Sequence, residues 1–223
     1  MIISFRKLYK ILLLPVFVLL ILSVLFFSIG ENVISNKIDN TKTIIIDAGH
    51  GGMDSGASSA QGLRESDLNL DIALKLKELL TISGYNVIMT REDTGSADGG
   101  FKFIKKNDVN HRIKIANKYS DVLFISIHMN SFSDEKYSGA QMFYDNDGKG
   151  RALAQKIQAS FKTIQADNTR DVKIVPPDVM LFKRIKNPVV LAECGFLSNT
   201  HEAELLSTDE YRTKVALIIL AGI

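Results

Sequence analysis

Short runs of β-branched residues alternate with longer stretches of helical periodicity, and this alternation continues from residue 43 to the end of the 223-residue chain. Strands that alternate with helices are typical of α/β proteins, in which helices cover both faces of a sheet. The run at 43–47, Thr-Ile-Ile-Ile-Asp, is apolar on both faces, as a strand between two helical layers should be. We therefore predict one α/β domain over residues 43–223, built on a mixed, mostly parallel sheet flanked by helices on both faces.

The remaining elements follow from the same patterns. Leucine and isoleucine recur at helical spacing from Leu68 to Leu80, with Ser66 as the expected N-cap and Gly84 just past the end. Further strands are expected at 85–90, 121–128, 139–144, 180–183 and 188–193, and further helices at 108–119, 151–161, 202–206 and 209–220. The strand at 139–144 is expected at or near an edge, and a long polar loop follows Arg91.

A segment without charged residues, 11–29, precedes this domain. Its 19 residues are about the length that a helix needs to cross a hydrocarbon core roughly 30 Å thick. Basic residues lie before it, in 1–10, and Glu31 follows it, so the positive-inside rule places the N-terminus in the cytoplasm and the domain outside the membrane. A cleaved signal peptide is the alternative, but the length of the run favours an uncleaved anchor. The polar stretch 30–42 is interpreted as a linker.

The charge and the cysteine content of the chain argue against some classes of function and of metal site. The chain has 27 basic and 25 acidic residues, and three of the basic ones lie in 1–10, which leaves 24 basic against 25 acidic residues in the rest. A domain so close to neutral lacks the net positive charge that attracts a phosphate backbone, which argues against nucleic acid as a partner. The single cysteine, Cys194, can form neither an intrachain disulfide nor a cysteine-rich metal site.

Three ionisable side chains stand at the carboxyl ends of predicted strands. His50 follows the first strand, His128 ends the strand at 121–128, and Glu193 ends the strand at 188–193. Ligands of α/β sheets bind outside these ends, so the three side chains meet if their strands are parallel neighbours. Two imidazoles and a carboxylate are a ligand set of catalytic zinc, which keeps one position open for water or substrate.

The carboxylate of this set is either Glu193 or Glu65. Glu65 follows a glycine-rich loop, and glycines permit such a loop to double back toward His50. Asp47 or Asp54 is then expected to orient an imidazole from the side away from the metal.

Other interpretations of these residues stay open. The histidines can be structural residues, with Glu193 as an ion-pair partner of Lys183 or Arg184. The glycine-rich loop at 49–56 can cradle a phosphate, although it lacks both the Gly-x-Gly-x-x-Gly order and the Lys-Ser/Thr ending of a P-loop. His111 and His201 are interpreted as structural or solvent-exposed.

Cys194 is a candidate nucleophile with His128 as its base. A regular strand turns Cys194 to the face opposite Glu193, into an apolar setting. A buried, inert thiol is therefore favoured over a reactive one.

Four strings of residues, in this order, resemble the zinc-dependent N-acetylmuramoyl-L-alanine amidases, and the match covers almost everything after residue 42. The strings are Ile-Ile-Asp-Ala-Gly-His-Gly-Gly at 45–52, Arg-Glu-Ser-Asp-Leu-Asn-Leu-Asp-Ile-Ala at 64–73, Phe-Ile-Ser-Ile-His-Met-Asn-Ser at 124–131 and Leu-Ala-Glu-Cys-Gly-Phe-Leu-Ser-Asn at 191–199. The resemblance implies that His50, Glu65 and His128 bind Zn²⁺ and that Glu193 is catalytic. The sequence departs from the family between 168 and 186, where an expected Arg-Gly pair reads Arg-Asp, so no substrate contact is assigned there.

An anchor joined to a bare catalytic domain is similar to the membrane-anchored spore-cortex, or germination-specific, amidases. This resemblance implies cleavage of the amide between N-acetylmuramic acid and L-alanine of peptidoglycan stem peptides, outside the cytoplasmic membrane and in the forespore intermembrane space. The product is then used for muramic-δ-lactam formation by a separate deacetylase. Besides peptidoglycan and the membrane, an accessory protein that stabilises metal binding is considered as a partner.

Two alternatives from other classes are a cysteine-dependent hydrolase that uses Cys194 and His128, and a peptidoglycan-binding module without catalysis. The cysteine hydrolase would be blocked by thiol alkylation and indifferent to chelators. The binding module would hold muropeptides without releasing a new amine.

Overall fold

The computed structural model describes residues 42–100, 104–177 and 179–223. The predicted basic segment, anchor and nearly all of the linker, residues 1–41, lie outside the described residues. Within the described ranges, the helices are all too short or too polar to cross a bilayer.

The described part of the chain forms a six-stranded sheet in the order β2-β1-β3-β6-β4-β5. Its strands are β1 (Thr43–Ala48), β2 (Asn86–Met89), β3 (Leu123–Asn130), β4 (Gln141–Tyr144), β5 (Lys173–Ile174) and β6 (Val189–Phe196). β4 runs antiparallel to β6, and the other neighbouring strands are parallel. The prediction of a mixed, mostly parallel sheet is therefore confirmed, and β4 lies next to the edge as expected.

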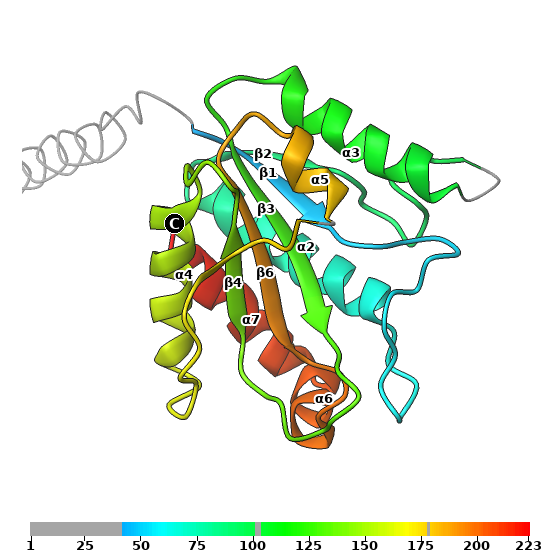
Figure 1. Ribbon diagram of the computed structural model, residues 1–223, viewed down its shortest axis with the longest axis vertical. Helices are drawn as coiled ribbons and strands as arrows, with labels where there is room; N and C mark the ends of the chain where they lie inside the picture. Colours follow the sequence, from blue (N-terminus) through cyan, green and yellow to red (C-terminus); the bar gives the residue numbers. More distant parts are fainter. Residues whose placement is uncertain (1–41, 101–103, 178) are drawn as a thin grey trace, which may run out of the picture. The chain divides into compact units, whose positions relative to one another are not determined.

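Helices cover both faces of the sheet (Figure 1). One face carries α2 (Glu65–Ile82), α4 (Arg151–Lys162) and α7 (Asp209–Ala221), and the other carries α3 (Lys105–Lys118) and α5 (Met180–Arg184), while α6 (Thr200–Ser207) follows β6. The strands are apolar on both sides because each side meets a helical layer: Ile44 and Ile46 of β1 belong to one core cluster and Ile45 to the other, and all three are fully buried.

Two expectations about local structure were wrong. Residues 180–183 were expected to form a strand, but they lie in α5, where Leu181 and Phe182 are buried against the sheet face under α3. Ser66 is not the N-cap of α2, because the helix already begins at Glu65 and Arg64 occupies the cap position without a side-chain hydrogen bond. The short edge strand β5 was not predicted.

The order of the strands positions the site. β1, β3 and β6 are consecutive, parallel neighbours at the centre of the sheet. His128 and Glu193 are directly paired in the register of β3 and β6, while His50 lies two residues beyond the end of β1. β3 and β6 continue for two and three residues past these side chains, to Asn130 and Phe196, so neither residue ends its strand as expected.

Candidate active site

The side chains of His50, Glu65 and His128 meet at the carboxyl ends of β1 and β3. One ligand atom from each lies within 4.8 Å of the other two. Glu65 Oε1 is 3.2 Å from His50 Nε2 and 2.9 Å from His128 Nδ1. The sequence analysis left Glu65 and Glu193 open as the carboxylate of this group, and the structure brings Glu65 to the two imidazoles.

The Glu65 carboxylate is held from several directions. It is the first residue of α2 and is buried. Its Oε2 accepts a hydrogen bond from the backbone N–H of Ala57 (2.8 Å), and its Oε1 accepts one from the N–H of Met129 (3.2 Å). Burial would raise the pKa of Glu65, but hydrogen bonds to His128 and His50 and the charge of these rings lower it well below its usual value. Glu65 is therefore an ionised carboxylate in a fixed orientation.

The His50 ring is oriented by Asp54. Asp54 Oδ2 lies 2.9 Å from His50 Nδ1, which leaves Nε2 to face Glu65. Burial would lower the pKa of His50, but hydrogen bonds and charge from Glu65 and Asp54 raise it to about 9. Asp54 thus occupies the orienting position that the sequence analysis had left open between Asp47 and Asp54.

Asp47 does not contact an imidazole. It is fully buried and accepts hydrogen bonds from Thr90 Oγ1 (2.7 Å), from Ser126 Oγ (2.6 Å) and from the Arg112 guanidinium. Burial would raise the pKa of Asp47, but Arg112 and the hydrogen bond from Ser126 lower it below its usual value. Asp47 therefore serves as the counter-ion of a buried arginine.

Two buried arginines hold the backbone that carries His50, and the sequence analysis assigned neither of them a role. Arg112 donates to the carbonyls of Ala48 (2.8 Å) and His50 (2.6 Å), and Arg91 donates to the carbonyls of Ala48 and Gly49 (2.9 Å each). Burial and the nearby charge of Arg112 lower the pKa of Arg91 to about 10. His50 itself has φ of 58°, an unfavourable conformation for a residue with a side chain, which these contacts hold in place.

A signal for Arg112 was present in the sequence. Asp108 and Arg112 are spaced i, i+4 on a predicted helix, and Arg112 Nε indeed donates to Asp108 Oδ2 at 2.7 Å. For Arg91, the only signal was its position directly after a predicted strand.

The donor set of His50, Glu65 and His128 fits a zinc ion. Ligands that surround zinc tetrahedrally at about 2.0–2.1 Å lie about 3.3 Å from one another, close to the separations of Glu65 Oε1 from both rings. Two nitrogens and one carboxylate oxygen are donors that zinc accepts, and only three protein ligands leave a fourth position free for water or substrate. The residues present therefore suit a catalytic zinc ion.

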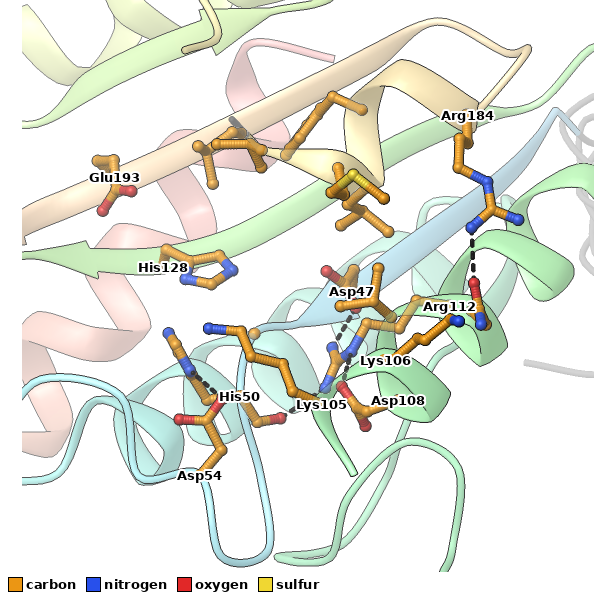
Figure 2. A pocket seen from close by; sticks show the side chains of 18 residues that line it. Asp47, His50, Asp54, Lys105, Lys106, Asp108, Arg112, His128, Arg184 and Glu193 are labelled. Atoms are coloured by element: carbon orange, nitrogen blue, oxygen red, sulfur yellow. Dashed lines mark hydrogen bonds and ion pairs between the residues drawn. The ribbon is translucent and has the colours of Figure 1, made fainter. Parts of the chain in front are cut away.

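Glu193 lies beside this group, in the same cleft as His50 and His128 (Figure 2). Its Oε2 is closed off from solvent and has no hydrogen-bond partner among the described residues. Burial raises the pKa of Glu193 to about 7. No ion pair joins it to Lys183 or Arg184 within the described part of the chain, so that interpretation of Glu193 is not supported.

Cys194 lies on the opposite side of β6. It is fully buried in the core cluster of the α2 and α7 face. Burial and the charge of Glu193 raise the pKa of its thiol far above the usual value. A thiol in this setting does not ionise near neutral pH, and it does not line the cleft with His128.

Comparisons with known proteins agree with this geometry. The family model of N-acetylmuramoyl-L-alanine amidases matches residues 44–223. The chain is 38% identical over 187 residues to the germination-specific N-acetylmuramoyl-L-alanine amidase of Bacillus subtilis, covering 82% of this chain and 78% of that protein. It is 28% identical over 233 residues to the amidase AmiA of Escherichia coli, covering 85% of this chain and 77% of that protein.

Solved structures show the same fold. The CwlD amidase from Clostridioides difficile, solved in complex with the GerS lipoprotein, superposes with a TM-score of 0.76 at 41% identity, covering 81% of this chain and 95% of that one. A second N-acetylmuramoyl-L-alanine amidase, from Clostridium difficile 630, has a TM-score of 0.70 at 30% identity, covering 82% and 95% of the two chains. With the family model matching from the first strand to the last residue, the chain belongs to the N-acetylmuramoyl-L-alanine amidase family.

Proposed function

We propose that this chain is a zinc-dependent amidase that hydrolyses the bond between N-acetylmuramic acid and the L-alanine of peptidoglycan stem peptides. Membership of the amidase family supports the reaction. The proposal of zinc dependence and of the catalytic site depends on one observation. A Glu193 carboxyl oxygen without a hydrogen-bond partner among the described residues lies in the same cleft as the group of His50, Glu65 and His128.

An amide resists hydrolysis because its carbonyl is a weak electrophile and its amine a poor leaving group. Zinc bound by the three side chains would supply a Lewis acid, which polarises the carbonyl and lowers the pKa of water. Glu193 accepts the proton of the attacking water and passes it to the departing alanine nitrogen. A carboxyl group whose pKa is about 7 can do both near neutral pH. Asp54, Arg91 and Arg112 keep His50 in the orientation that the site requires.

Substitution of Glu193 by Gln tests this assignment, because it keeps the shape of the side chain and removes its basicity. We expect the release of amino groups from purified peptidoglycan to fall at least a hundredfold, while the zinc content, measured by elemental analysis, stays at the wild-type level. His128→Ala is expected to lose both activity and zinc. An active Glu193→Gln protein would refute the catalytic role.

The two competing classes are separated by inhibitors. A chelator should abolish the activity and added Zn²⁺ should restore it, whereas thiol alkylation should leave it intact because Cys194 is buried. Activity that resists the chelator but not alkylation would favour the cysteine hydrolase. Binding to peptidoglycan without release of amines would favour the wall-binding module.

We further propose a role in spore-cortex maturation, with residues 11–29 as the anchor and the domain outside the membrane. The similarity to a germination-specific amidase supports the cortex role. Spores of a deletion strain should then lack muramic-δ-lactam, and cell fractionation should recover the protein with the membrane. Normal lactam content in such spores would contradict the role.

An accessory protein is the remaining proposed partner, since the CwlD relative was solved with a lipoprotein bound. Zinc content of the chain purified alone and after co-expression with a lipoprotein from the same cells would test whether a partner raises metal occupancy. Equal occupancy would argue against a partner that stabilises metal binding.

A further inference from the structure

The cleft that contains His50, His128 and Glu193 continues beyond them, between α3 and α5. Its volume is about 650 Å³, within the range of about 300–1,000 Å³ typical of ligand sites. Figure 2 shows Glu193 and Arg184 at opposite ends of this cleft, with Lys106 on the wall formed by α3 and the Lys105 side chain extending toward His50 and His128. The cleft is therefore longer than the chemistry at the metal group needs, and its far part is available to bind the substrate.

The acidic residues of the cleft away from Glu193 all have cationic or imidazole partners. Asp47 and Asp108 both pair with Arg112, the charge of the buried Arg91 also acts on these two carboxylates, and Asp54 pairs with His50. Their charges are thus largely balanced within the protein, and they contribute little negative potential to the α3 and α5 wall.

Two exposed cations on this wall, Lys106 and Arg184, have no such balance among the described residues. They form no salt bridge with any carboxylate there, whereas the charge of Lys105 acts on Asp54. Arg184 Nη1 instead donates to Asn110 Oδ1 at 2.6 Å, a neutral partner that holds the guanidinium in place and does not compensate its charge. A guanidinium fixed in this way can accept a carboxylate with two parallel hydrogen bonds.

The stretch between the metal group and the two cations Lys106 and Arg184 is apolar. It is lined by Val109 of α3 and by Val179, Met180 and Leu181 at α5, and the Met180 side chain is 58% exposed. Among the described residues that line the cleft, Phe182 is the one phenylalanine, tyrosine or tryptophan, and it is only 5% exposed, so the described part of this wall presents no aromatic surface on which a sugar ring could stack. Aliphatic contacts followed by cations suit a short anionic peptide better than a neutral glycan strand.

We infer that Lys106 and Arg184 bind the carboxylates of the stem peptide, so that the peptide half of the substrate lies along α3 and α5 while its acyl end reaches Glu193. This inference rests on the proposed function and deepens it by assigning one half of the substrate to one arm of the cleft. It also accounts for two cations that have no carboxylate partner among the described residues and that the reaction itself does not need.

The test compares one synthetic muramyl peptide in two forms, with its carboxyl groups either free or all converted to carboxamides. The full-length, zinc-loaded chain should hydrolyse the free form with a kcat/KM about five- to tenfold higher, the size expected for one or two partly exposed charge-assisted contacts. In the Lys106→Met, Arg184→Gln double variant this ratio should fall to about one. The ratio in the wild type should also shrink as salt is raised.

Two further variants exclude general effects. Lys114→Met removes an equally exposed lysine of α3 that does not line the cleft, and it should keep the wild-type ratio. Arg184→Glu should reverse the preference toward the carboxamide, a result that damage to the fold would not produce. A wild-type ratio near one, or an equal loss on both substrates in the double variant, overturns the inference.

A chain that hydrolyses neither form would contradict the proposed function but not this inference. The free stem peptide and its carboxamide would then be titrated into the zinc-loaded chain by calorimetry. Tighter binding of the carboxylate form, lost in the double variant and kept in Lys114→Met, supports the peptide site, and equal affinities overturn it.

Discussion

At the scale of single residues, two glycines make room for the imidazoles. A Cβ on Gly49 would lie 2.2 Å from His128 Nε2, and a Cβ on Gly56 would lie 2.4 Å from Glu65 Oε2 and 2.7 Å from His50 Cδ2. Real carbon atoms do not approach so closely, so any side chain at these positions displaces a proposed ligand. From the sequence, the only predicted role of these glycines was to let the loop double back.

Gly56→Ala is therefore expected to lose most of its zinc. Gly56 has φ of +63°, so the variant also carries backbone strain of about 1–3 kcal/mol. Gly62→Ala is the matched control, because Gly62 has φ of +84° with nothing within 4 Å of the added Cβ. It should show the strain, measured as a lower free energy of unfolding, and keep full zinc content. Equal zinc content in both variants would show that Gly56 does not protect the site.

The lowered pKa of Asp47 makes the free energy of unfolding depend on pH. Its pKa is depressed in the folded protein, so its contribution is complete above the unfolded value of about 3.9 and is lost as the pH falls through the folded value. Asp47→Asn leaves Arg112 with Asp108 as its only buried counter-ion among the described residues and should cost about 1–3 kcal/mol at pH 7. Urea unfolding should show the gap between variant and wild type closing below about pH 4. A gap that is constant with pH would contradict the ion pair.

At the scale of elements, Arg91 connects the end of β1 with the start of α2. It donates to Ser66 O (2.8 Å) as well as to the carbonyls of Ala48 and Gly49, so it links the segments that carry His50 and Glu65. It contacts neither ligand side chain itself. We interpret it as a positioning residue.

Arg91→Met should weaken zinc binding about ten- to a hundredfold, the usual effect of removing a group that supports the ligands. Competition with a fluorescent chelator would measure the affinity. Arg64→Met serves as the control, because Arg64 is exposed and its contact to Gly52 O is long, at 3.4 Å. An unchanged affinity in Arg91→Met would mean that the other contacts of the loop suffice.

The sequence predicted the long elements better than the short ones. Leu68 to Leu80 gave several turns of helical periodicity, and α2 formed as expected. Residues 180–183 offered only four positions, and such a short apolar run fits a strand or a helix equally well. Tertiary packing decided for the helix, since Leu181 and Phe182 cover the sheet under α3. β5 has only two exposed residues and no apolar pattern to detect.

At the scale of the whole molecule, the proposed metal ligands join three parts of the chain that are distant in sequence. His50 follows β1, Glu65 begins α2 and His128 lies on β3. An ion that binds only the folded arrangement stabilises it by about 2.7 kcal/mol when its free concentration is 100 times the dissociation constant. For a domain of this size, each kcal/mol corresponds to about 2–4 °C in Tm.

Zinc at that excess should therefore raise the Tm of the wild type by about 5–10 °C relative to the protein with chelator. Differential scanning fluorimetry measures this shift directly. His128→Ala should melt at the same temperature with and without zinc. A zinc-dependent shift that survives in His128→Ala would place the ion elsewhere.

The meeting of the site residues was predictable because it depends only on parallel strands that end at one edge of the sheet. His50, His128 and Glu193 each follow or lie within an apolar run, and such runs are visible in the sequence. Which carboxylate would reach the imidazoles was not predictable from the residues alone, since it depends on the path of the loop before Glu65. The two buried arginines were likewise hidden, because composition does not show which cations are enclosed.

Because His128 and Glu193 are directly paired in neighbouring strands, the spacing of the sheet sets the distance between them. The gap between neighbouring strands is about 4.7–4.9 Å, so backbone hydrogen bonds, rather than flexible loops, fix how far the Glu193 side chain stands from the proposed ligand His128. A shift of the β6 register by one residue would turn Cys194 toward the cleft and Glu193 toward the apolar core. A protein with this shifted register would lack Glu193 in the cleft and would be inactive. The correct register of β6 is therefore a condition for the proposed activity.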